Sequence, residues 1–473
     1  MADDRKNELE ATLKKQRDAF TAARPEPVSV RKDRIKRAMA MVTDRGDELA
    51  RAMAADFGNR SVHQSMLTDI AATVGAGKHA LKHIDSWSKT EKRKVQFPLG
   101  LLGAKAEVRY EPKGVIGILS PWNFPVQLAF GPLMQVLAAG NRAMIKPSEF
   151  TERTSAIMAE VVAKYFAEEE VALYTGGPEV AAAFSSLPFD HLVFTGSTEV
   201  GRKVMAAASE NLTPVTLELG GKSPTVVAPG YPIARAAKRI LAGKLLNAGQ
   251  TCIAPDYVLV PRAGLQTFVE HAARQARRMY PRGLADTDFT SVINARQYTR
   301  LTRYLEEAQA AGVKSVPLFD GPPRDAAARR LGPVVLVDPP ATLAVMREEI
   351  FGPILPVLPY DDVADAVQFI NAQPRPLALY WFDNDGKRTD WALRETHVGG
   401  ACVNETLLHV AQEELPFGGV GPSGMGHYHG RWGFDTLSKL TPVFRQSRLN
   451  GMEVFMPPYR PVVHRLLALM KRW

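Results

Sequence analysis

Short apolar runs alternate with helical stretches between residues 114 and 195, and this alternation constrains the fold more than any other feature of the chain. The predicted elements are a strand at 114–119, a helix at 127–139, a strand at 142–146, a helix at 154–166, and strands at 171–174 and 191–195. Strands and helices that alternate on this scale form a parallel sheet with helices packed on its faces. The sequence therefore predicts an α/β fold.

The first 90 residues are predicted to be mainly helical. A charged amphipathic helix at 4–23 ends before Pro25 and Pro27, and further helices are predicted at 28–56 and 64–87. None of these segments contains obvious catalytic residues. We therefore expect them to pack against the domain that contains the sheet.

Composition restricts the class of protein. The chain has 473 residues, a formal net charge of +9 and a pI of about 9.4. The basic residues are scattered and no aromatic-basic RNA motif occurs, so a general attraction for anionic ligands is expected rather than nucleic-acid binding. The longest uncharged run contains three prolines and is not a membrane span. The first residues do not resemble a secretory signal and cysteine is sparse, which predicts a cytoplasmic location.

One of the two cysteines, Cys252, is predicted to lie in an ordered loop. The strand-like run 257–260 follows it, and Gly249 and Pro255 bracket the thiol. Such a loop can hold a thiol rigidly and leave it reachable. A buried structural thiol is the alternative, and this stretch alone favours neither interpretation.

Two further segments contain residues that suit thiol chemistry. Glu218 lies between two leucines, and apolar flanks disfavour its charged form, which makes it a better general base near neutral pH. Asn123 lies between prolines and aromatic residues, where its amide could donate to a developing oxyanion. The alternatives are an exposed glutamate at a strand end and a turn-forming asparagine.

These residues resemble the aldehyde dehydrogenase superfamily, in particular its class 3 branch and, within that branch, the bacterial coniferyl aldehyde dehydrogenases. Seven motifs occur in the order typical of the family: 121–125, 146–149, 194–201, 217–224, 249–257, 348–353 and 416–421. The resemblance runs from about Tyr110 to about Ser438. It implies an aldehyde dehydrogenase-like fold with a Rossmann-like cofactor domain, an α/β catalytic domain and a small oligomerisation arm.

The resemblance also implies a division of the chain. Residues 1–90 and 112–214 are expected to form the dinucleotide-binding domain, 215–411 the catalytic domain, and 91–111 and 412–473 the oligomerisation arm and C-terminal tail. A homodimer is expected. For the arm, a surface hairpin within one subunit is the alternative.

The resemblance assigns a first group of residues to a bound NAD at a strand-to-helix turn. Gly196, Ser197 and Gly201 lie at this turn, and backbone amides at a helix N-terminus favour a phosphate group. A sequence of this kind also often simply caps a helix. The glycine pattern differs from the G-x-G-x-x-G fingerprint, as is normal in this family.

A second group of cofactor residues is assigned in the same way. Lys146 and Glu149 are expected at the adenosine ribose, and Glu349 and Phe351 at the nicotinamide ribose and ring. Gly220, two residues after Glu218, is the last residue assigned to the cofactor. Because a carboxylate at residue 149 would repel a 2′-phosphate, NAD is expected to be preferred, with NADP also accepted. As alternatives, Lys146 and Glu149 could be solvated loop charges, Glu349 a glutamate at a strand end and Phe351 a core residue.

The implied reaction is oxidation of an aldehyde to a carboxylic acid. Cys252 attacks the carbonyl as a thiolate, Asn123 and the Cys252 N–H hold the oxyanion, and Glu218 activates water to hydrolyse the resulting thioester. No metal site is predicted, because no zinc-ligand spacing was identified. Trp122 and Phe417 suggest a hydrophobic entrance for an aromatic or medium-chain aldehyde such as coniferyl aldehyde.

Two rival functions are considered. A coenzyme A-acylating relative would not need Glu218, and a non-catalytic binding protein would not need the three residues of the proposed mechanism. The second cysteine, Cys402, is predicted to be buried and inert in an apolar strand. The tail at 460–472 is predicted to be a helix packed on the protein, with a basic membrane-surface helix as the alternative.

Overall fold

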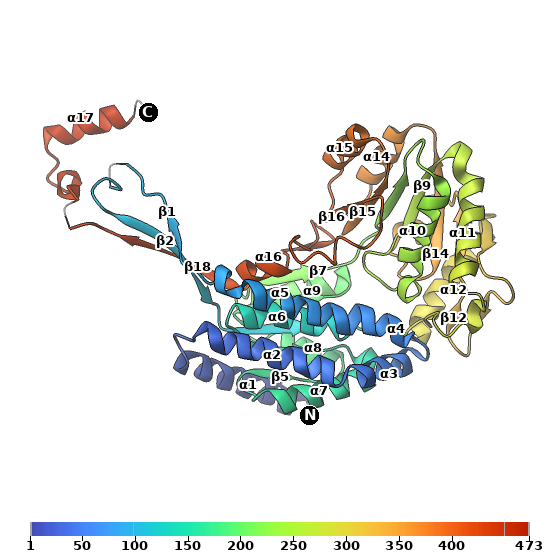
Figure 1. Ribbon diagram of the computed structural model, residues 1–473, viewed down its shortest axis with the longest axis horizontal. Helices are drawn as coiled ribbons and strands as arrows, with labels where there is room; N and C mark the ends of the chain where they lie inside the picture. Colours follow the sequence, from blue (N-terminus) through green and yellow to red (C-terminus); the bar gives the residue numbers. More distant parts are fainter. Residues whose placement is uncertain (1, 98, 449, 472–473) are drawn as a thin grey trace.

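Two large sheets and one narrow arm make up the molecule (Figure 1). The computed structural model describes residues 2–97, 99–448 and 450–471. The predicted domain ranges 1–90 and 412–473 and the predicted tail helix therefore extend past the described residues. The predicted α/β fold is confirmed.

The first sheet has the strand order β17-β7-β6-β3-β4-β5. Its strands are β3 (Val115–Leu119), β4 (Arg142–Lys146), β5 (Val171–Leu173), β6 (His191–Thr195), β7 (Val215–Glu218) and β17 (Gly424–Met425). All neighbours are parallel except β17 and β7. The four strands predicted in this region are confirmed. β7 pairs with β6, so this sheet extends past residue 215, and the predicted domain division stays a prediction.

Helices cover both faces of the first sheet. They are α1 (Ala2–Ala22), α2 (Val28–Asp44), α3 (Gly46–Phe57), α4 (Val62–Ser65), α5 (Ala72–Trp87), α6 (Gln127–Ala138), α7 (Glu152–Tyr165), α8 (Pro178–Ser185) and α9 (Thr198–Ser209). Ile116 and Ile118 of β3 face a core that includes α2, α5 and α6. Val115 and Leu119 face the other side, toward α1, α8 and α9. This alternation follows from the two-residue period of a strand.

Two predicted N-terminal helices are interrupted in the structure. The single helix predicted at 28–56 is α2 and α3, which are separated by Arg45, whose φ of −116° and ψ of 16° are not helical. The helix predicted at 64–87 starts as α4, passes through a π-helical turn at Met66–Ala71 and continues as α5. Such turns often occur at functional sites. This turn contains the fully buried Asp69.

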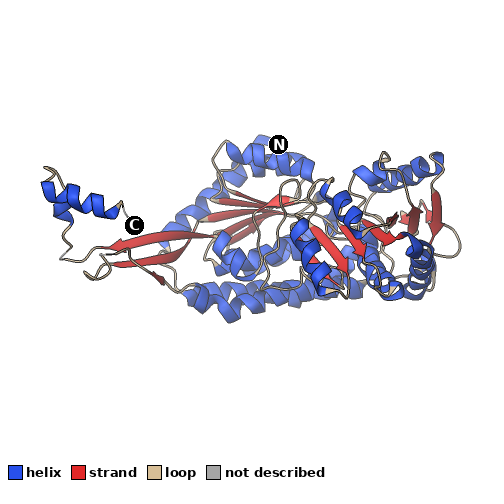
Figure 2. Ribbon diagram, turned by 90° about the horizontal axis from the view of Figure 1, so that it is seen from above, coloured by secondary structure: helices blue, strands red, loops and turns tan. Residues whose placement is uncertain are grey.

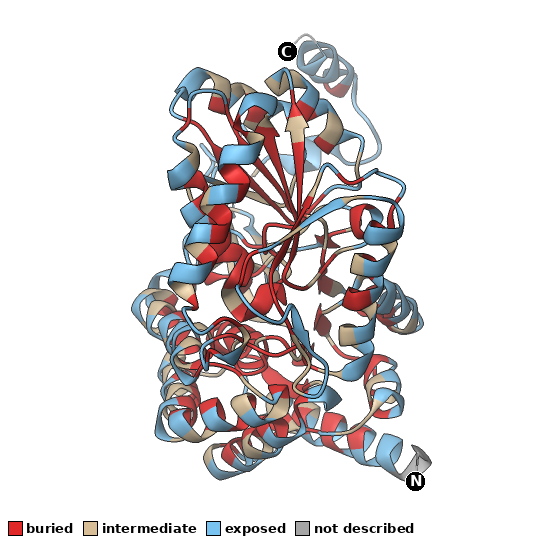
Figure 3. Ribbon diagram, turned by 90° about the vertical axis from the view of Figure 1, so that its right-hand side faces the viewer, coloured by how far each residue is buried: buried red, intermediate tan, exposed pale blue. Residues whose placement is uncertain are grey.

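The second sheet has the order β10-β13-β14-β9-β8-β15-β16, with only β10 antiparallel to its neighbour. Its strands are β8 (Pro224–Val227), β9 (Tyr257–Pro261), β10 (Lys314–Pro317), β13 (Val334–Val337), β14 (Ile354–Tyr360), β15 (Ala378–Phe382) and β16 (Gly400–Val403). Its helices are α10 (Ile233–Leu245), α11 (Leu265–Met279), α12 (Ala295–Ala310), α13 (Ala344–Arg347), α14 (Val363–Asn371) and α15 (Gly386–Glu395). The inner strands are buried between helices whose outer surfaces are exposed (Figure 3), whereas the edge strands β10 and β16 are at least partly exposed.

The arm is an antiparallel sheet that projects away from the two lobes (Figure 2). It contains β1 (Glu91–Arg93), β2 (Lys105–Pro112) and β18 (Ser438–Arg445) in the order β1-β2-β18, and α16 (Gly430–Thr436) precedes β18. The strand predicted at 105–110 is confirmed. The remaining short elements are β11 (Arg324–Asp325), β12 (Arg330–Leu331) and single turns at Glu149–Thr151, Leu246–Gly249, Arg262–Gly264, Gly283–Ala285 and Met452–Phe455.

The predicted tail helix forms, as α17 (Pro461–Met470), but it lies beyond the arm and not on the body of the protein (Figure 1). Val463 is its one buried residue within the described part of the chain. Leu467 and Leu469 are exposed. The prediction that this helix packs on the protein is therefore wrong for the single chain. Among the described residues, no helix is long and apolar enough to cross a bilayer.

Candidate active site

Several predicted site residues follow the carboxyl ends of parallel strands in the first sheet. β3 leads to Asn123, β4 ends at Lys146, β6 leads to Gly196 and β7 ends at Glu218. Because these strands are parallel, their carboxyl ends lie at one edge of the sheet. Open α/β sheets bind ligands at this edge.

The second sheet contributes residues from the amino ends of its strands. β8, β9 and β14 are adjacent and parallel, and the segments that lead into them contain Gly220, Cys252 and Glu349. A Cβ added to Gly220 would lie 2.0 Å from a carboxylate oxygen of Glu349, so these two residues are in direct contact. The charge of Glu218 also acts on the Cys252 thiol. The site therefore forms where an edge of each sheet meets the other.

An unusual backbone conformation precedes the thiol. Asn247, Ala248 and Gly249 have φ values of 50°, 51° and 77°. A Cβ added to Gly249 would lie 2.4 Å from the carbonyl oxygen of Gly352, so only glycine fits there. Backbone conformations of this rarely populated kind cluster at functional sites. The half-buried Cys252 follows directly on this loop.

The buried Gln250 holds the loop in place. Its side-chain amide donates to the carbonyl oxygens of Asn247 and Ser291, both at 3.0 Å. Its side-chain oxygen accepts from the Ile293 N–H at 3.0 Å. The ordered loop predicted around Cys252 is therefore confirmed, and its order comes from hydrogen bonds to an amide two residues before the thiol.

Asn123 lies against the same loop. Its side-chain amide donates to the Gln250 carbonyl oxygen at 3.1 Å, and its own carbonyl accepts from the Arg60 guanidinium at 2.6 Å. Arg60 is paired with Asp69 at 2.7 Å, and neither side chain is exposed. Asp69 also accepts from the backbone N–H of Val126 at 3.2 Å. A buried ion pair thus supports the segment that holds Asn123.

Glu218 is buried at the end of β7, and neither carboxylate oxygen has a hydrogen-bond partner. Burial without a partner disfavours the charged form, so the pKa of Glu218 is raised well above its ordinary value. The buried Tyr428 is close enough for the charges of Glu218 and Cys252 to act on its phenol. A carboxyl group in this environment can exchange a proton with a reacting group near neutral pH.

The Cys252 thiol is protonated at neutral pH. Burial is the main cause of its pKa being raised to about 12, and the charges of Glu349 and Glu218 raise it further. The backbone N–H of Ile253 favours the thiolate and acts in the opposite direction. The thiol and both carboxyl groups therefore lie close together, as the sequence predicts for Cys252 and Glu218.

Glu349 and Phe351 lie on the segment that enters β14. Burial, and then the charge of Asp256, raises the pKa of Glu349 to about 8. Phe351 has a left-handed backbone (φ 48°) and its ring meets Trp122 edge to face, with 5.4 Å between ring centroids. Trp122 precedes Asn123, so this aromatic contact joins the segments from the two sheets.

Lys146 and Glu149 form an ion pair at the end of β4, with 3.7 Å between the ammonium and a carboxylate oxygen. The Lys146 side chain is almost completely buried, whereas Glu149 is about one third exposed. Burial lowers the pKa of Lys146, and the charge of Glu149 opposes this effect. The pair therefore places one buried cation and one accessible carboxylate at the edge where the sheet binds ligands.

Ser197 is the N-cap of α9, and its hydroxyl accepts from the Val200 N–H at 3.4 Å. A Cβ added to Gly201 would lie 2.6 Å from the Leu219 side chain, so this glycine lets α9 pack closely on the sheet. A Cβ added to Gly196 would lie 2.5 Å from the Phe194 ring. This helix N-terminus and the exposed carboxylate of Glu149 lie at the sheet edge where a dinucleotide would bind, and both are compatible with one.

Comparison with known proteins agrees with this geometry. Residues 1–443 match the "Aldehyde dehydrogenase family". The chain is 46% identical to a probable coniferyl aldehyde dehydrogenase of Caulobacter vibrioides, over 99% of this chain and 97% of that protein. It is 36% identical to the rat aldehyde dehydrogenase family 3 member A2, over 96% and 91% of the two chains. The substrate-bound structure of Staphylococcus aureus AldH superposes with a TM-score of 0.91 at 36% identity, over 98% and 99% of the two chains.

The chain belongs to the aldehyde dehydrogenase family. The predicted resemblance, including its class 3 character, and the predicted fold class are thereby confirmed. The protein is an enzyme, a dehydrogenase that uses a nicotinamide dinucleotide to oxidise an aldehyde.

This aldehyde dehydrogenase also contains site residues that the sequence analysis missed. The Lys222 ammonium bonds Asp256 and donates to the carbonyl oxygens of Val345 and Glu348 at 2.8 and 2.9 Å. Asp256 in turn accepts from the Ile350 N–H at 2.9 Å. This network ties the segment of Glu349 to the loop of Cys252. Asp256 lies inside the thiol motif, but only its contact with a lysine distant in sequence reveals its role.

The structure corrects the prediction for Cys402 in this dehydrogenase. Cys402 is only half-buried, because it lies in the edge strand β16. Its thiol lies against the backbone N–H groups of His409 and Leu408, and burial raises its pKa. The thiol is therefore protonated at neutral pH. That Cys402 takes no part in the reaction stays a prediction.

Proposed function

We propose that this dehydrogenase oxidises an aromatic aldehyde, with coniferyl aldehyde as the leading candidate, to the carboxylic acid through a cysteine thioester. The supporting observation is the convergence of Cys252 with the buried, unpartnered carboxyl group of Glu218. Asn123 is hydrogen-bonded to the same loop. A nucleophile, a proton acceptor and an amide donor are the groups that thioester chemistry requires.

In the first half-reaction, the Cys252 sulfur forms a bond to the aldehyde carbon. The Asn123 amide and the Cys252 N–H stabilise the oxyanion of the thiohemiacetal. A bound nicotinamide, held near Gly220, Glu349 and Phe351, would supply the hydride acceptor for this carbon. Because the pKa of the thiol is raised to about 12, a proton must leave the thiol as the reaction begins. Glu218 receives this proton in its ionised form.

In the second half-reaction, Glu218 removes a proton from water, which attacks the thioester and releases the acid and the thiolate. Loss of a positioned general base typically slows its step by about 10²–10⁴-fold. A coenzyme A-acylating enzyme would not need a buried carboxyl group in this position. Glu218 therefore favours hydrolysis over acyl transfer.

The dinucleotide is assigned to the edge of the first sheet. Lys146 and Glu149 are proposed at the adenosine ribose, Gly196, Ser197 and Gly201 at the phosphates, and Gly220, Glu349 and Phe351 near the nicotinamide. The arrangement of these residues supports this assignment: Glu349 touches Gly220, and Phe351 lies against the segment of Asn123.

NAD is proposed to be preferred over NADP, because the accessible carboxylate of Glu149 would repel a 2′-phosphate. Glu149→Gln should bring the dissociation constants for NADP and NAD closer to each other, as measured by fluorescence titration with each cofactor. Glu152→Gln, an exposed change at the start of α7, should leave the ratio unaltered. Equal or tighter binding of NADP by the unaltered enzyme would refute the preference.

Aromatic side chains near the site support an aromatic substrate. Trp122 and Phe124 flank Asn123, and Phe417 is stacked on His429 with 5.4 Å between ring centroids. The related proteins named as coniferyl aldehyde dehydrogenases support the same choice. Initial rates with a panel of aromatic and aliphatic aldehydes test it: the highest kcat/KM should be for a 4-hydroxycinnamaldehyde.

The mechanism is tested with Glu218→Gln and coniferyl aldehyde. The variant should release a burst of NADH of up to about one per active site and then stall as an acyl-enzyme. Intact mass spectrometry should detect the acyl group on Cys252, and hydroxylamine should restore some turnover. Glu210→Gln, an exposed change just after α9, should turn over at the unaltered rate.

Two outcomes would contradict the mechanism. Full turnover of Glu218→Gln to the free acid would mean that another group activates water. A requirement for coenzyme A in the native enzyme would favour the acyl-transferring rival.

The domain division, oligomeric state and location are also proposals. We assign the first sheet with its helices to dinucleotide binding, the second sheet to catalysis, and the arm to oligomerisation. A homodimer is proposed because the arm and tail expose apolar side chains such as Phe444 and Met470. The two free thiols fit a cytoplasmic location, which cell fractionation would test.

A further inference from the structure

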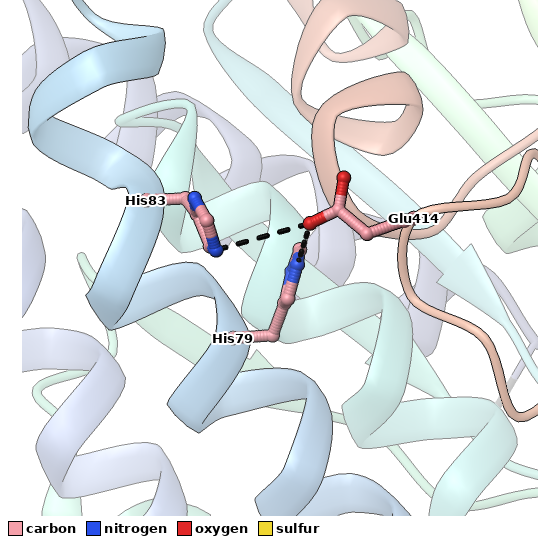
Figure 4. Close-up of side chains that lie close together, drawn as sticks. All are labelled: His79, His83 and Glu414. Atoms are coloured by element: carbon pink, nitrogen blue, oxygen red, sulfur yellow. Dashed lines mark hydrogen bonds and ion pairs between the residues drawn. The ribbon is translucent and has the colours of Figure 1, made fainter.

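Two histidines of α5 and one glutamate form a cluster whose spacing the sequence analysis overlooked (Figure 4). The Nε2 atom of His79 lies 2.6 Å from the Oε1 atom of Glu414, and the Nε2 atom of His83 lies 3.8 Å from the same oxygen. One potential ligand atom of each residue lies within 4.8 Å of the other two. Within the described residues, no other group of three such side chains is this compact.

The convergence follows from the elements involved. His79 and His83 are four residues apart, so they lie on one face of α5. Glu414 belongs to the segment between β16 and β17, and its carbonyl oxygen accepts from the Trp432 indole N–H at 3.4 Å. Trp432 lies on α16, which packs on α5 through the contact of Phe434 with Trp87. The fold therefore holds the backbone of Glu414 beside the two imidazoles.

We propose that His79, His83 and Glu414 bind a zinc ion. Two imidazole nitrogens and one carboxylate oxygen are ligands that zinc prefers, and three protein ligands leave a fourth position for water. Ligand bonds of about 2.0–2.2 Å place tetrahedral ligand atoms roughly 3.3 Å apart. The observed separations of 2.6 and 3.8 Å lie on either side of this value, so small side-chain movements suffice.

Two buried atoms without partners lie behind the cluster. His79 Nδ1 and Glu413 Oε2 make no hydrogen bond. The Glu413 backbone and the His79 ring both border Gly430, so these two residues lie near each other. A zinc-bound imidazole usually donates its other N–H to a carboxylate, which fixes the orientation of the ring. A side-chain movement of Glu413 would let it accept such a hydrogen bond when His79 Nε2 binds the metal.

A glycine allows this close approach. Gly430 has a left-handed backbone (φ 46°), and a Cβ added to it would lie 2.1 Å from the Glu413 carbonyl oxygen and 3.0 Å from His79 Cε1. A larger residue would separate the 413–414 segment from α5. The position therefore requires glycine both for its backbone angle and for the space that the cluster needs.

Zinc would join two parts of the molecule that are distant in sequence. α5 packs against the first sheet, whereas Glu414 lies three residues before Phe417. A metal bound to both would restrain the segment that leads to Phe417 and its stacking partner His429. Zinc binding itself does not depend on the proposed reaction, and its test needs no substrate.

The test uses the full chain with Cys252→Ser, which removes the active-site thiol as a competing ligand. After treatment with a chelator, Zn²⁺ is titrated by calorimetry. About one ion per chain should bind, and His79→Ala or His83→Ala in the same background should weaken binding by more than tenfold. Glu413→Gln should weaken it by about 10–100-fold, the usual effect of losing such a supporting carboxylate. His271→Ala, in α11 of the other lobe, should not alter it.

A spectroscopic measurement distinguishes this site from zinc bound elsewhere. The Trp87 ring lies 5.6 Å from His79 and 5.7 Å from His83, between ring centroids. Co²⁺ in the site should therefore quench part of the tryptophan fluorescence, and Trp87→Phe should remove that part. Unchanged circular dichroism shows that each variant is folded. Zinc binding that survives both histidine substitutions, or no binding by the folded starting protein, would overturn the proposal.

Discussion

Three residues at the site, Cys252, Glu218 and Glu349, all have pKa values that burial raises. Each is neutral at a pH where its free counterpart would be partly or fully charged. The charges of the two carboxyl groups also raise the pKa of the thiol, so ionisation of one group disfavours ionisation of the next. All three groups therefore hold their protons over much of the neutral range, and a carboxyl group must first ionise before it can accept the proton of the thiol.

The raised pKa of Glu218 makes a prediction about stability. A buried carboxyl group with a folded pKa above its unfolded value keeps its proton in the folded state after the unfolded state has lost it. Between the ordinary value of 4.5 and the raised folded value, stability must therefore fall as pH rises. Glu218→Gln removes this effect. The free energy of unfolding of Glu218→Gln, relative to that of the native protein, should therefore rise by up to about 1.4 kcal/mol for each pH unit in this window.

Urea unfolding of both proteins at several values of pH between 5 and 8 measures this difference. Glu210→Gln supplies the control, because its side chain is exposed and its substitution should give a difference that does not vary with pH. A difference between Glu218→Gln and the native protein that is constant over this range would show that Glu218 is charged in the folded state.

The predictable part of the site is the part that local sequence specifies. Cys252, Glu218 and Asn123 each lie in a segment whose neighbours restrict the backbone, so their placement could be predicted. The pairs Arg60–Asp69 and Lys222–Asp256 were missed. Nothing near either residue of a pair indicates the other, because burial of an ion pair depends on elements that meet only in the folded chain.

At the scale of secondary structure, apolar strands were easier to predict than breaks in helices. The strands at 142–146 and 191–195 match β4 and β6, because both consist of continuous buried residues. The break at Arg45 and the π-helical turn at Met66–Ala71 were missed. Around Met66–Ala71 the apolar residues keep a helical spacing, so the local pattern gives no sign of the turn, and around Arg45 the polar run 43–48 is as compatible with an exposed helix face as with a break.

The π-helical turn gives a prediction about positioning. Asp69→Asn leaves the Arg60 guanidinium buried without its counterion, and breaking a buried pair typically destabilises by about 3–5 kcal/mol. Because Arg60 also bonds the Asn123 carbonyl oxygen, kcat should fall as the oxyanion donor loses its position. The dissociation constant for the dinucleotide should change little. Steady-state kinetics, cofactor titration and urea unfolding measure the three quantities.

Asp33→Asn is the control for Asp69→Asn, because it breaks an ion pair that is exposed and not buried. Asp33 pairs with Arg37 on the outer surface of α2, where 63% of the aspartate side chain is exposed. Exposed pairs contribute about 0–1 kcal/mol, so stability and kcat should both stay near those of the native enzyme. A normal kcat for Asp69→Asn would mean that the ion pair does not position Asn123.

At the scale of the whole molecule, the net charge is not scattered as the sequence analysis predicts. Residues 88–112 and 438–473, which include the arm and tail, contain 13 Lys and Arg and 4 Asp and Glu. The rest of the chain contains 46 of each, so the arm and tail account for the whole formal charge of +9. Two arms would repel each other. The arm of one subunit is therefore expected to dock on the formally neutral body of a second copy.

The apolar face of β18 provides the test of this dimer. Leu440 and Phe444 lie on one side of the strand, since alternate residues share a face, and they are 43% and 52% exposed. Phe444→Glu would place a charge in the proposed interface, and light scattering after gel filtration should then give the mass of one chain where the native protein gives two. Leu212→Glu, at a site that is 89% exposed in the turn after α9, should leave the dimer intact. A native protein that is monomeric at micromolar concentration, or a dimer unaffected by Phe444→Glu, would refute this use of the arm.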